Sequence, residues 1–133
     1  MKTYTLLLVE DEEGLRKVYT DYLTENGFDV IEAKDGEEAV EKAIKYADDI
    51  DIVLLDLMLP KLDGLGVLKM LRNNNKTRNL LIYITTVLAS DETIKETKEL
   101  GADGYMIKDN LTPEDIKNRI IELIKSNENQ GVK

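Results

Sequence analysis

The chain has 133 residues, the size of one domain with a buried core. Its formal net charge of −9 argues against a nucleic-acid surface, because phosphate binding requires clustered Lys and Arg side chains. The absence of Cys and His excludes disulfides, thiol chemistry, zinc sites and imidazole acid–base catalysis. No apolar stretch is long enough for a signal peptide or a membrane span, so we expect a cytoplasmic protein without membrane contact.

Short apolar runs predict five β-strands, at residues 4–9, 28–33, 52–55, 80–85 and 104–107. A helical pattern follows each strand. In the first helix the expected inward-facing residues are Leu15, Val18, Tyr19, Tyr22 and Leu23. In the second they are Ala39, Val40, Ala43, Ile44 and Ala47, and in the third Leu65, Leu68 and Leu71.

The last two helices differ in how firmly we expect them to be held. Between Ser90 and Gly101 the strong apolar anchors are Ile94 and Leu100, so the fourth helix should be loosely packed. The last helix begins at Thr112–Pro113 and carries a continuous apolar stripe. We expect the folded domain to cover residues 1–126, and residues 127–133 to form a polar tail or the start of a linker.

Strands that alternate with helices predict right-handed crossovers and a parallel sheet covered on both faces. We therefore expect an α/β protein with a flavodoxin-like, doubly wound (βα)5 three-layer sandwich and strand order 2-1-3-4-5. The switch point of that order lies between the first and third strands. Glu10, Asp11 and Asp56 follow these two strands or end them, so the three carboxylates should converge in one crevice.

Asp56 is the acid on which we centre the prediction. It ends an unbroken apolar run typical of a strand buried on both faces, and open α/β sheets bind ligands at the carboxyl ends of such strands. The alternative is that Asp56 caps the next helix. Pro60 and Gly64 intervene before that helix, which argues against the cap.

Three neighbouring carboxylates require neutralisation, because each close pair costs about 4 kcal/mol at 4 Å and an effective dielectric constant of about 20. Oxygen ligands without His or Cys favour Mg²⁺, with Mn²⁺ as the alternative. The competing interpretation is that residues 10–13 are only a solvated acidic helix start. The preceding buried strand and the nearby Asp56 favour a metal.

Two more polar residues follow the fourth and fifth strands. Thr86 lies 30 positions after Asp56, and Lys108 lies a further 22 along the chain. A hydroxyl can donate to a phosphoryl oxygen, and an ammonium can neutralise one. Singly, Thr86 could be a turn former and Lys108 a surface residue, but their placement at successive strand ends favours a functional role.

From Leu6 to about Ile124 the chain resembles the response-regulator receiver domains of two-component signalling. The resemblance rests on Val9–Glu12, on the run from Asp56 to Pro60 with Asp63–Gly64, on Thr86, and on Gly101–Tyr105 with Lys108. It implies that Asp56 is the phosphoacceptor. It also implies that Glu10, Asp11, Asp56 and the backbone carbonyl of Met58 hold Mg²⁺.

The same resemblance assigns the remaining site residues. Thr86 and Lys108 would bind phosphoryl oxygens, and Tyr105 would rotate inward when Thr86 moves towards the phosphate. Plain core packing is the alternative for Tyr105. Asp63 has no ligand role in the family, and Pro60 and Gly64 shape the loop.

The function implied is phosphoryl transfer from a sensor histidine kinase or phosphotransfer protein to Asp56. The domain would catalyse its own phosphorylation and dephosphorylation rather than act as an enzyme on other substrates. The fourth helix, fifth strand and last helix would then bind a downstream target, an effector domain or a second copy of the chain. The chain would be a stand-alone receiver or a fragment of a longer regulator or hybrid kinase.

The sequence departs from the family pattern beside the site. Asp109 replaces the Pro that usually follows Lys108, so we expect a trans peptide there, since a cis bond before a non-proline residue costs about 2.5–4 kcal/mol. Val87 replaces the usual Ala. With Met58 and Leu88 also apolar, we predict slow self-dephosphorylation.

Three other functions are the alternatives to a receiver. Aspartyl phosphatases resembling the haloacid dehalogenases need a second acid where Met58 stands. Flavodoxin-type electron carriers need a neutral, hydroxyl-rich loop where residues 10–13 are acidic. A pseudo-receiver that binds partners without phosphorylation is the strongest alternative, and the presence of every site residue type argues against it.

Overall fold

The computed structural model describes residues 3–87 and 90–131. Its parallel sheet has the order β2-β1-β3-β4-β5, as predicted. The strands are β1 (Thr5–Val9), β2 (Asp29–Ala33), β3 (Ile52–Asp56), β4 (Ile82–Thr86) and β5 (Gly104–Ile107). The helices are α1 (Glu13–Glu25), α2 (Gly36–Lys45), α3 (Gly64–Arg72), α4 (Asp91–Glu99) and α5 (Pro113–Gly131), with a short 3-10 turn, η1, at Lys108–Asn110.

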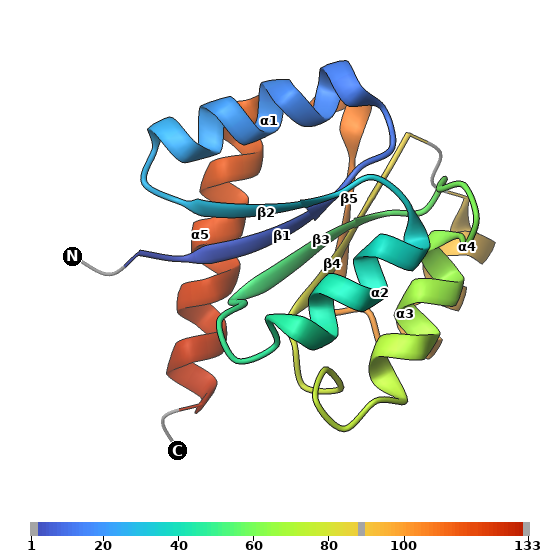
Figure 1. The fold of residues 1–133 in the computed structure, drawn as a ribbon. Helices are drawn as coiled ribbons and strands as arrows, with labels where there is room; N and C mark the ends of the chain where they lie inside the picture. Colours follow the sequence, from blue (N-terminus) through green and yellow to red (C-terminus); the bar gives the residue numbers. More distant parts are fainter. Residues whose placement is uncertain (1–2, 88–89, 132–133) are drawn as a thin grey trace.

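The sheet forms the middle of three layers (Figure 1). On one face, Leu6, Leu8 and Leu54 pack with residues of α1 and α5. On the other, Leu7 and Val53 pack with residues of α2 and α3. The central strands β1 and β3 thus bury both faces, and this accounts for their apolar runs without polar alternation.

Details of the prediction need correction. Val18 is 52% exposed, because α1 faces the sheet with Tyr19 and Leu23, and the next position along a helix lies about 100° away. Ala47 lies beyond the end of α2. The fourth strand begins at Ile82 rather than Leu80, and Thr86 is its last residue rather than the residue after it.

The segment that leads into β4 is held by the side chain of Arg72, at the end of α3. Its guanidinium donates to the carbonyls of Leu80 (2.7 Å) and Gly101 (2.9 Å) and to the carboxylate of Asp103 (3.0 Å). The Asp103 carboxylate also accepts the backbone N–H of Ile82. Arg72 therefore fastens the chain that leaves α4 to the base of the sheet.

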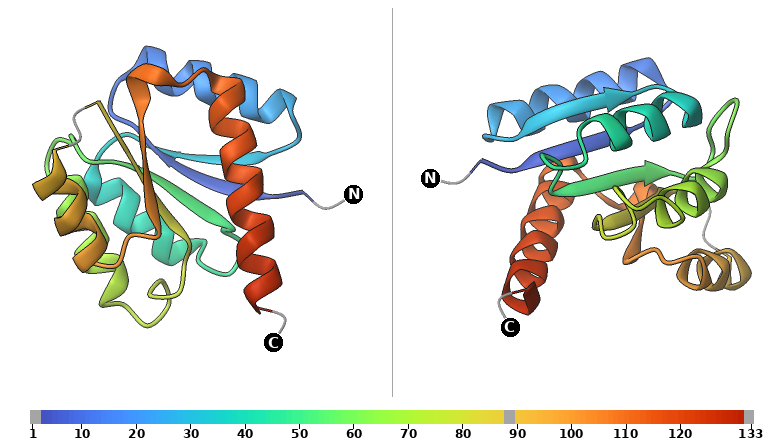
Figure 2. Two further views of the ribbon diagram at one scale, coloured as in Figure 1. Left: turned by 180° about the vertical axis from the view of Figure 1, so that it is seen from behind. Right: turned by 60° about the horizontal axis from the view of Figure 1, so that its bottom comes forward.

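Helix α4 packs loosely, as predicted. Within α4 only Thr97 is buried, and Ile94 is half-buried. Figure 2 shows α4 at the periphery of the molecule, on the side away from α5.

Helix α5 continues to Gly131, past the apolar stripe that ends at Ile124. The domain boundary at residue 126 stays a prediction. None of the helices in the described residues combines the length and apolar character of a membrane span.

Candidate functional site

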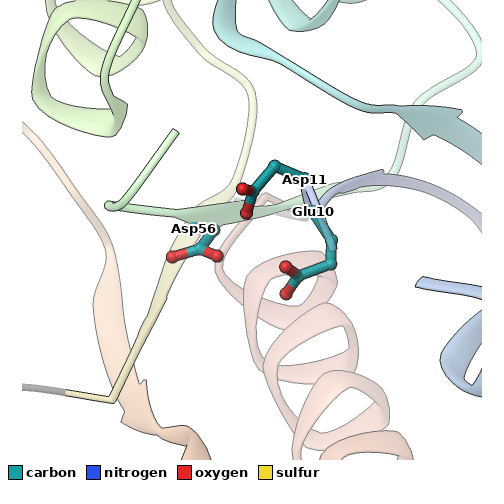
Figure 3. Close-up of side chains that lie close together, drawn as sticks. All are labelled: Glu10, Asp11 and Asp56. Carbon is teal, nitrogen blue, oxygen red and sulfur yellow. The ribbon is translucent and has the colours of Figure 1, made fainter. Parts of the chain in front are cut away.

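The carboxyl ends of β1 and β3 bring three acids together. Val9 and Leu55 are partners in the parallel register, so Glu10, directly after β1, and Asp56, the last residue of β3, lie at the same level. One carboxylate oxygen from each of Glu10, Asp11 and Asp56 lies within 4.8 Å of the others. Figure 3 shows these side chains pointing towards a common space. Glu10 and Asp56 are buried, whereas Asp11 is exposed and leaves one side open to solvent.

A single ammonium group links two of these acids. The Nζ atom of Lys108 donates to Asp56 Oδ2 at 2.8 Å and to Glu10 Oε1 in a shorter contact. The Lys108 side chain is only 9% exposed. Lys108 directly follows β5, which lies on the other side of β3 from β1 in the sheet. Its side chain therefore approaches the crevice from the side opposite to Glu10.

Burial and pairing act in opposite directions on these charges. Burial raises the pKa of Glu10, and hydrogen bonds from Lys108 and from the Glu12 N–H offset only part of that rise. Burial alone would lower the pKa of Lys108, but its bonds to Asp56 and Glu10 outweigh burial, so this pKa is raised. The ammonium form of Lys108 is therefore the form that the crevice stabilises.

The second oxygen of Asp56 is engaged by its own loop. Asp56 Oδ1 accepts the backbone N–H of Met58 at 3.0 Å. Helix α3 is capped by Asp63, whose carboxylate accepts the Gly66 N–H at 2.8 Å. The alternative that Asp56 caps this helix is therefore wrong.

Thr85 and Thr86 both lie buried at the end of β4, but they belong to opposite faces of the sheet. Thr85 pairs with Asp56 in the register between β3 and β4. Thr86 shares its face with Ile84, whose partner on β5 is Tyr105. Tyr105 is half-buried and packs with the cluster that contains Ile84. Thr86 and Tyr105 thus lie on one face of the sheet, and the switch role of these two residues stays a prediction.

A groove of about 630 Å³ opens beside the acids, between the β3–α3 loop and the first turns of α3 and α4. Its lining includes Asp11, Met58, Leu65 and Thr93. The Met58 side chain is 63% exposed. The groove therefore gives this side of the crevice an apolar border.

Val87, which stands where the family usually has Ala, is 46% exposed. Leu88, named with it in the sequence analysis, lies outside the described residues. The Lys108–Asp109 peptide is trans, as predicted, and η1 closes with a bond from the Leu111 N–H to the Lys108 carbonyl.

The donor set suits a hard divalent cation, because the three converging side chains supply only carboxylate oxygens. The exposed Asp11 also leaves room for water ligands. Two features were not foreseen from the sequence. One is the pairing of Lys108 with Glu10, and the other is the contact of the β3–α3 loop with Asp35 and Gly36.

Comparison with known proteins gives a consistent result. The family model of the response regulator receiver domain matches residues 6–121. The chain is 38% identical over 125 residues to the alkaline phosphatase synthesis transcriptional regulatory protein PhoP of Bacillus subtilis, covering 92% of this chain and 49% of that protein. The chain thus spans about half the length of such curated relatives.

Solved structures agree with this match. The Vibrio cholerae chemotaxis protein CheY4 superposes with a TM-score of 0.83 at 27% identity, covering 91% of this chain and 98% of that one. The CheX-CheY-BeF3-Mg complex of Borrelia burgdorferi gives 0.81 at 30% identity, covering 90% and 88% of the two chains.

The Lys108 pairing leads to a stability prediction. In EDTA at pH 7, Lys108→Met should lower the free energy of unfolding by about 3 kcal/mol, because two buried acids lose their counter-charge. Since the pKa of Lys108 is raised on folding, its contribution is complete below the unfolded pKa of about 10.4 and is lost as the pH rises through the folded value. Urea unfolding at pH 7 and above pH 10.5 tests both statements.

The matched control is Lys17→Met, which removes an exposed ion pair with Asp21 on α1. It should change stability little at either pH. Equal stabilities of wild type and Lys108→Met at pH 7 would contradict the prediction.

Proposed function

The chain belongs to the response regulator receiver domains, and from that membership we propose that Asp56 accepts a phosphoryl group in a two-component phosphorelay. The observation that carries the proposal is the convergence of Glu10, Asp11 and Lys108 on Asp56 at the carboxyl end of the sheet. The donor would be the phosphohistidine of a sensor histidine kinase or of a phosphotransfer protein.

The metal would be held by carboxylates of Glu10, Asp11 and Asp56 and by the backbone carbonyl of Met58. Mg²⁺ is the expected ion, and Mn²⁺ can replace it. When bound, the ion supplies positive charge where negative charge develops during transfer. Support comes from the all-oxygen donor set and from the open side at Asp11.

The residues of the chain would act around the transferred group. A carboxylate oxygen of Asp56 forms the new bond to phosphorus as the nitrogen–phosphorus bond of the donor breaks, and the departing imidazole takes up a proton. Lys108, whose ammonium group donates a hydrogen bond to Asp56 Oδ2, would pair with one phosphoryl oxygen. The Thr86 hydroxyl would donate a hydrogen bond to another phosphoryl oxygen. Water later hydrolyses the acyl phosphate and restores Asp56.

The output would be a change in the surface formed by α4, β5 and α5. That surface would bind a downstream protein, an effector domain or a second copy of the chain. The Borrelia burgdorferi relative was solved in complex with CheX, and the Bacillus subtilis relative is named a transcriptional regulatory protein. Neither the partner nor the cytoplasmic location expected from the sequence follows from these likenesses, so both stay predictions.

Intact-mass spectrometry after incubation with acetyl phosphate tests the proposal. Wild-type protein should gain one phosphoryl group in the presence of Mg²⁺ and none in EDTA. Asp56→Asn should gain none, because the amide lacks the nucleophilic oxygen anion.

Asp63→Asn is the matched control, since it changes an acid of the same loop and keeps the oxygen that caps α3. It should be phosphorylated like wild type. If wild-type protein gains nothing from acetyl phosphate or from phosphorylated kinase donors, the phosphoacceptor role is wrong and the pseudo-receiver takes its place.

The exposed Met58 leads to a prediction about phosphoryl lifetime. Its apolar side chain beside Asp56 cannot orient an attacking water, so self-dephosphorylation should be slow, with a lifetime of minutes or more. Met58→Asn should accelerate hydrolysis about fivefold, the effect of one hydrogen bond of about 1 kcal/mol on the barrier.

Phosphate release after removal of the donor measures this rate. Met70→Asn replaces the exposed methionine of α3 and should leave the rate unchanged. A wild-type lifetime of seconds, or an unchanged rate in Met58→Asn, would contradict the prediction.

Tyr105 should couple phosphorylation to α4. Hydrogen exchange across residues 90–107 should change when wild-type protein is phosphorylated, because inward rotation of Tyr105 repacks the loosely held helix. Tyr105→Ala should keep phosphorylation but lose most of that change. Tyr46→Ala, which removes a half-buried Tyr next to α2, should behave like wild type. A wild-type change in hydrogen exchange in Tyr105→Ala would mean that Tyr105 only packs in the core and does not act as a switch.

A further inference from the structure

The turn between β2 and α2 supports the loop that carries Met58. Gly36 donates its N–H to the carbonyl of Pro60 at 3.5 Å. A Cβ atom at Gly36 would collide with the carbonyl oxygen of Leu62, a backbone atom that cannot rotate away. Glycine at this position is therefore what allows the two chain segments to touch.

The supported segment has an unusual conformation. The Leu62 N–H donates to the carbonyl of Pro60 at 2.8 Å, which closes a three-residue turn. At the centre of this turn Lys61 has φ = 68°, in the left-handed region that residues other than glycine seldom adopt. Such a turn persists only where its surroundings hold it.

A buried carboxylate completes the support. Asp35 Oδ1 caps α2 by accepting the Glu38 N–H at 2.8 Å, and this bond lowers the pKa of Asp35. Asp35 Oδ2 lies 3.6 Å from Lys61 Nζ. One ionised side chain thus fixes the start of α2 and faces the positively charged residue at the centre of the turn.

The other end of the loop lies at the acids. Met58 donates its N–H to Asp56, and Gly64 donates to the carbonyl of Leu57 at 3.0 Å. The loop between residues 57 and 64 is therefore tied to the site at its base and to the β2–α2 turn at its tip. Pro60 is only two residues from Met58, so a displaced tip would change the direction of the Met58 carbonyl.

We propose that Asp35 and Gly36 are positioning residues for the site, which hold the β3–α3 loop so that the Met58 carbonyl completes the cation site. The proposal rests on the metal ligands given under Proposed function. It assigns a function to residues that touch neither the cation nor the phosphoryl group.

Mn²⁺ affinity, measured from the electron paramagnetic resonance signal of unbound Mn²⁺, tests the proposal without phosphorylation. Gly36→Ala should weaken binding about tenfold, within the range for groups that orient metal ligands. Asp35→Asn keeps an oxygen for the helix cap but removes the charge, and Lys61→Gln removes its partner. Each should weaken binding by a smaller factor, and the double variant should lose less than the product of the two factors.

Controls separate positioning from general destabilisation. Lys61→Arg keeps the positive charge and should bind like wild type. Ile120→Val loosens the opposite face of the sheet, where Ile120 is fully buried, and should also keep wild-type affinity. Far-UV circular dichroism at the temperature of the titration establishes that each variant is folded.

Wild-type affinity in folded Gly36→Ala and in Asp35→Asn would overturn the proposal. If Gly36→Ala does not fold, Asp35→Asn and Lys61→Gln decide it in the same way. A wild-type protein that binds no Mn²⁺ would count against the proposed metal site itself, which is a different result from equal affinities.

Discussion

The site depends on one largely buried ammonium group, that of Lys108, which lies between the buried carboxylates of Glu10 and Asp56. Glu10 directly follows β1 and Asp56 ends the adjacent strand β3, and Lys108 supplies the positive charge that stabilises these two carboxylates close together. Under the proposed function a divalent cation and a phosphoryl group would join this site, and Lys108 would exchange a carboxylate partner for a phosphoryl oxygen without losing its pairing.

This arrangement follows from the parallel sheet. All strands of a parallel sheet end at the same edge. Residues about 50 positions apart in the chain therefore meet there because of the sheet topology alone. The apolar runs of β1 and β3 indicate central strands, because a strand buried on both faces lies inside the sheet, and five strands that alternate with helices favour the order 2-1-3-4-5. For the same reason the convergence of Glu10, Asp11 and Asp56 could be predicted from the sequence alone.

Other features could not be predicted in this way. The hydrogen bonds of Arg72 to the carbonyls of Leu80 and Gly101 depend on the folded position of its side chain, which no local sequence pattern indicates. The exposure of Val18 depends on which stripe of α1 meets the sheet, and the apolar spacing of that helix permits more than one. The contact of Gly36 with the β3–α3 loop joins two irregular segments, and neither hydrophobic periodicity nor the residue types of the turns predict such a contact.

The hydrogen bonds from Arg72 to Gly101 and Asp103 anchor the chain just after α4, so a tilt of this helix would pivot about its carboxyl end. A helix of 9 residues is about 13 Å long, so a tilt of about 10° about that end moves the first turn by about 2 Å and the last turn hardly at all. The first turn carries Thr93, which lines the groove beside Asp11 and Met58. Under the proposed function, a change at the acids would therefore reach α4 at the end of the helix that such a tilt displaces most.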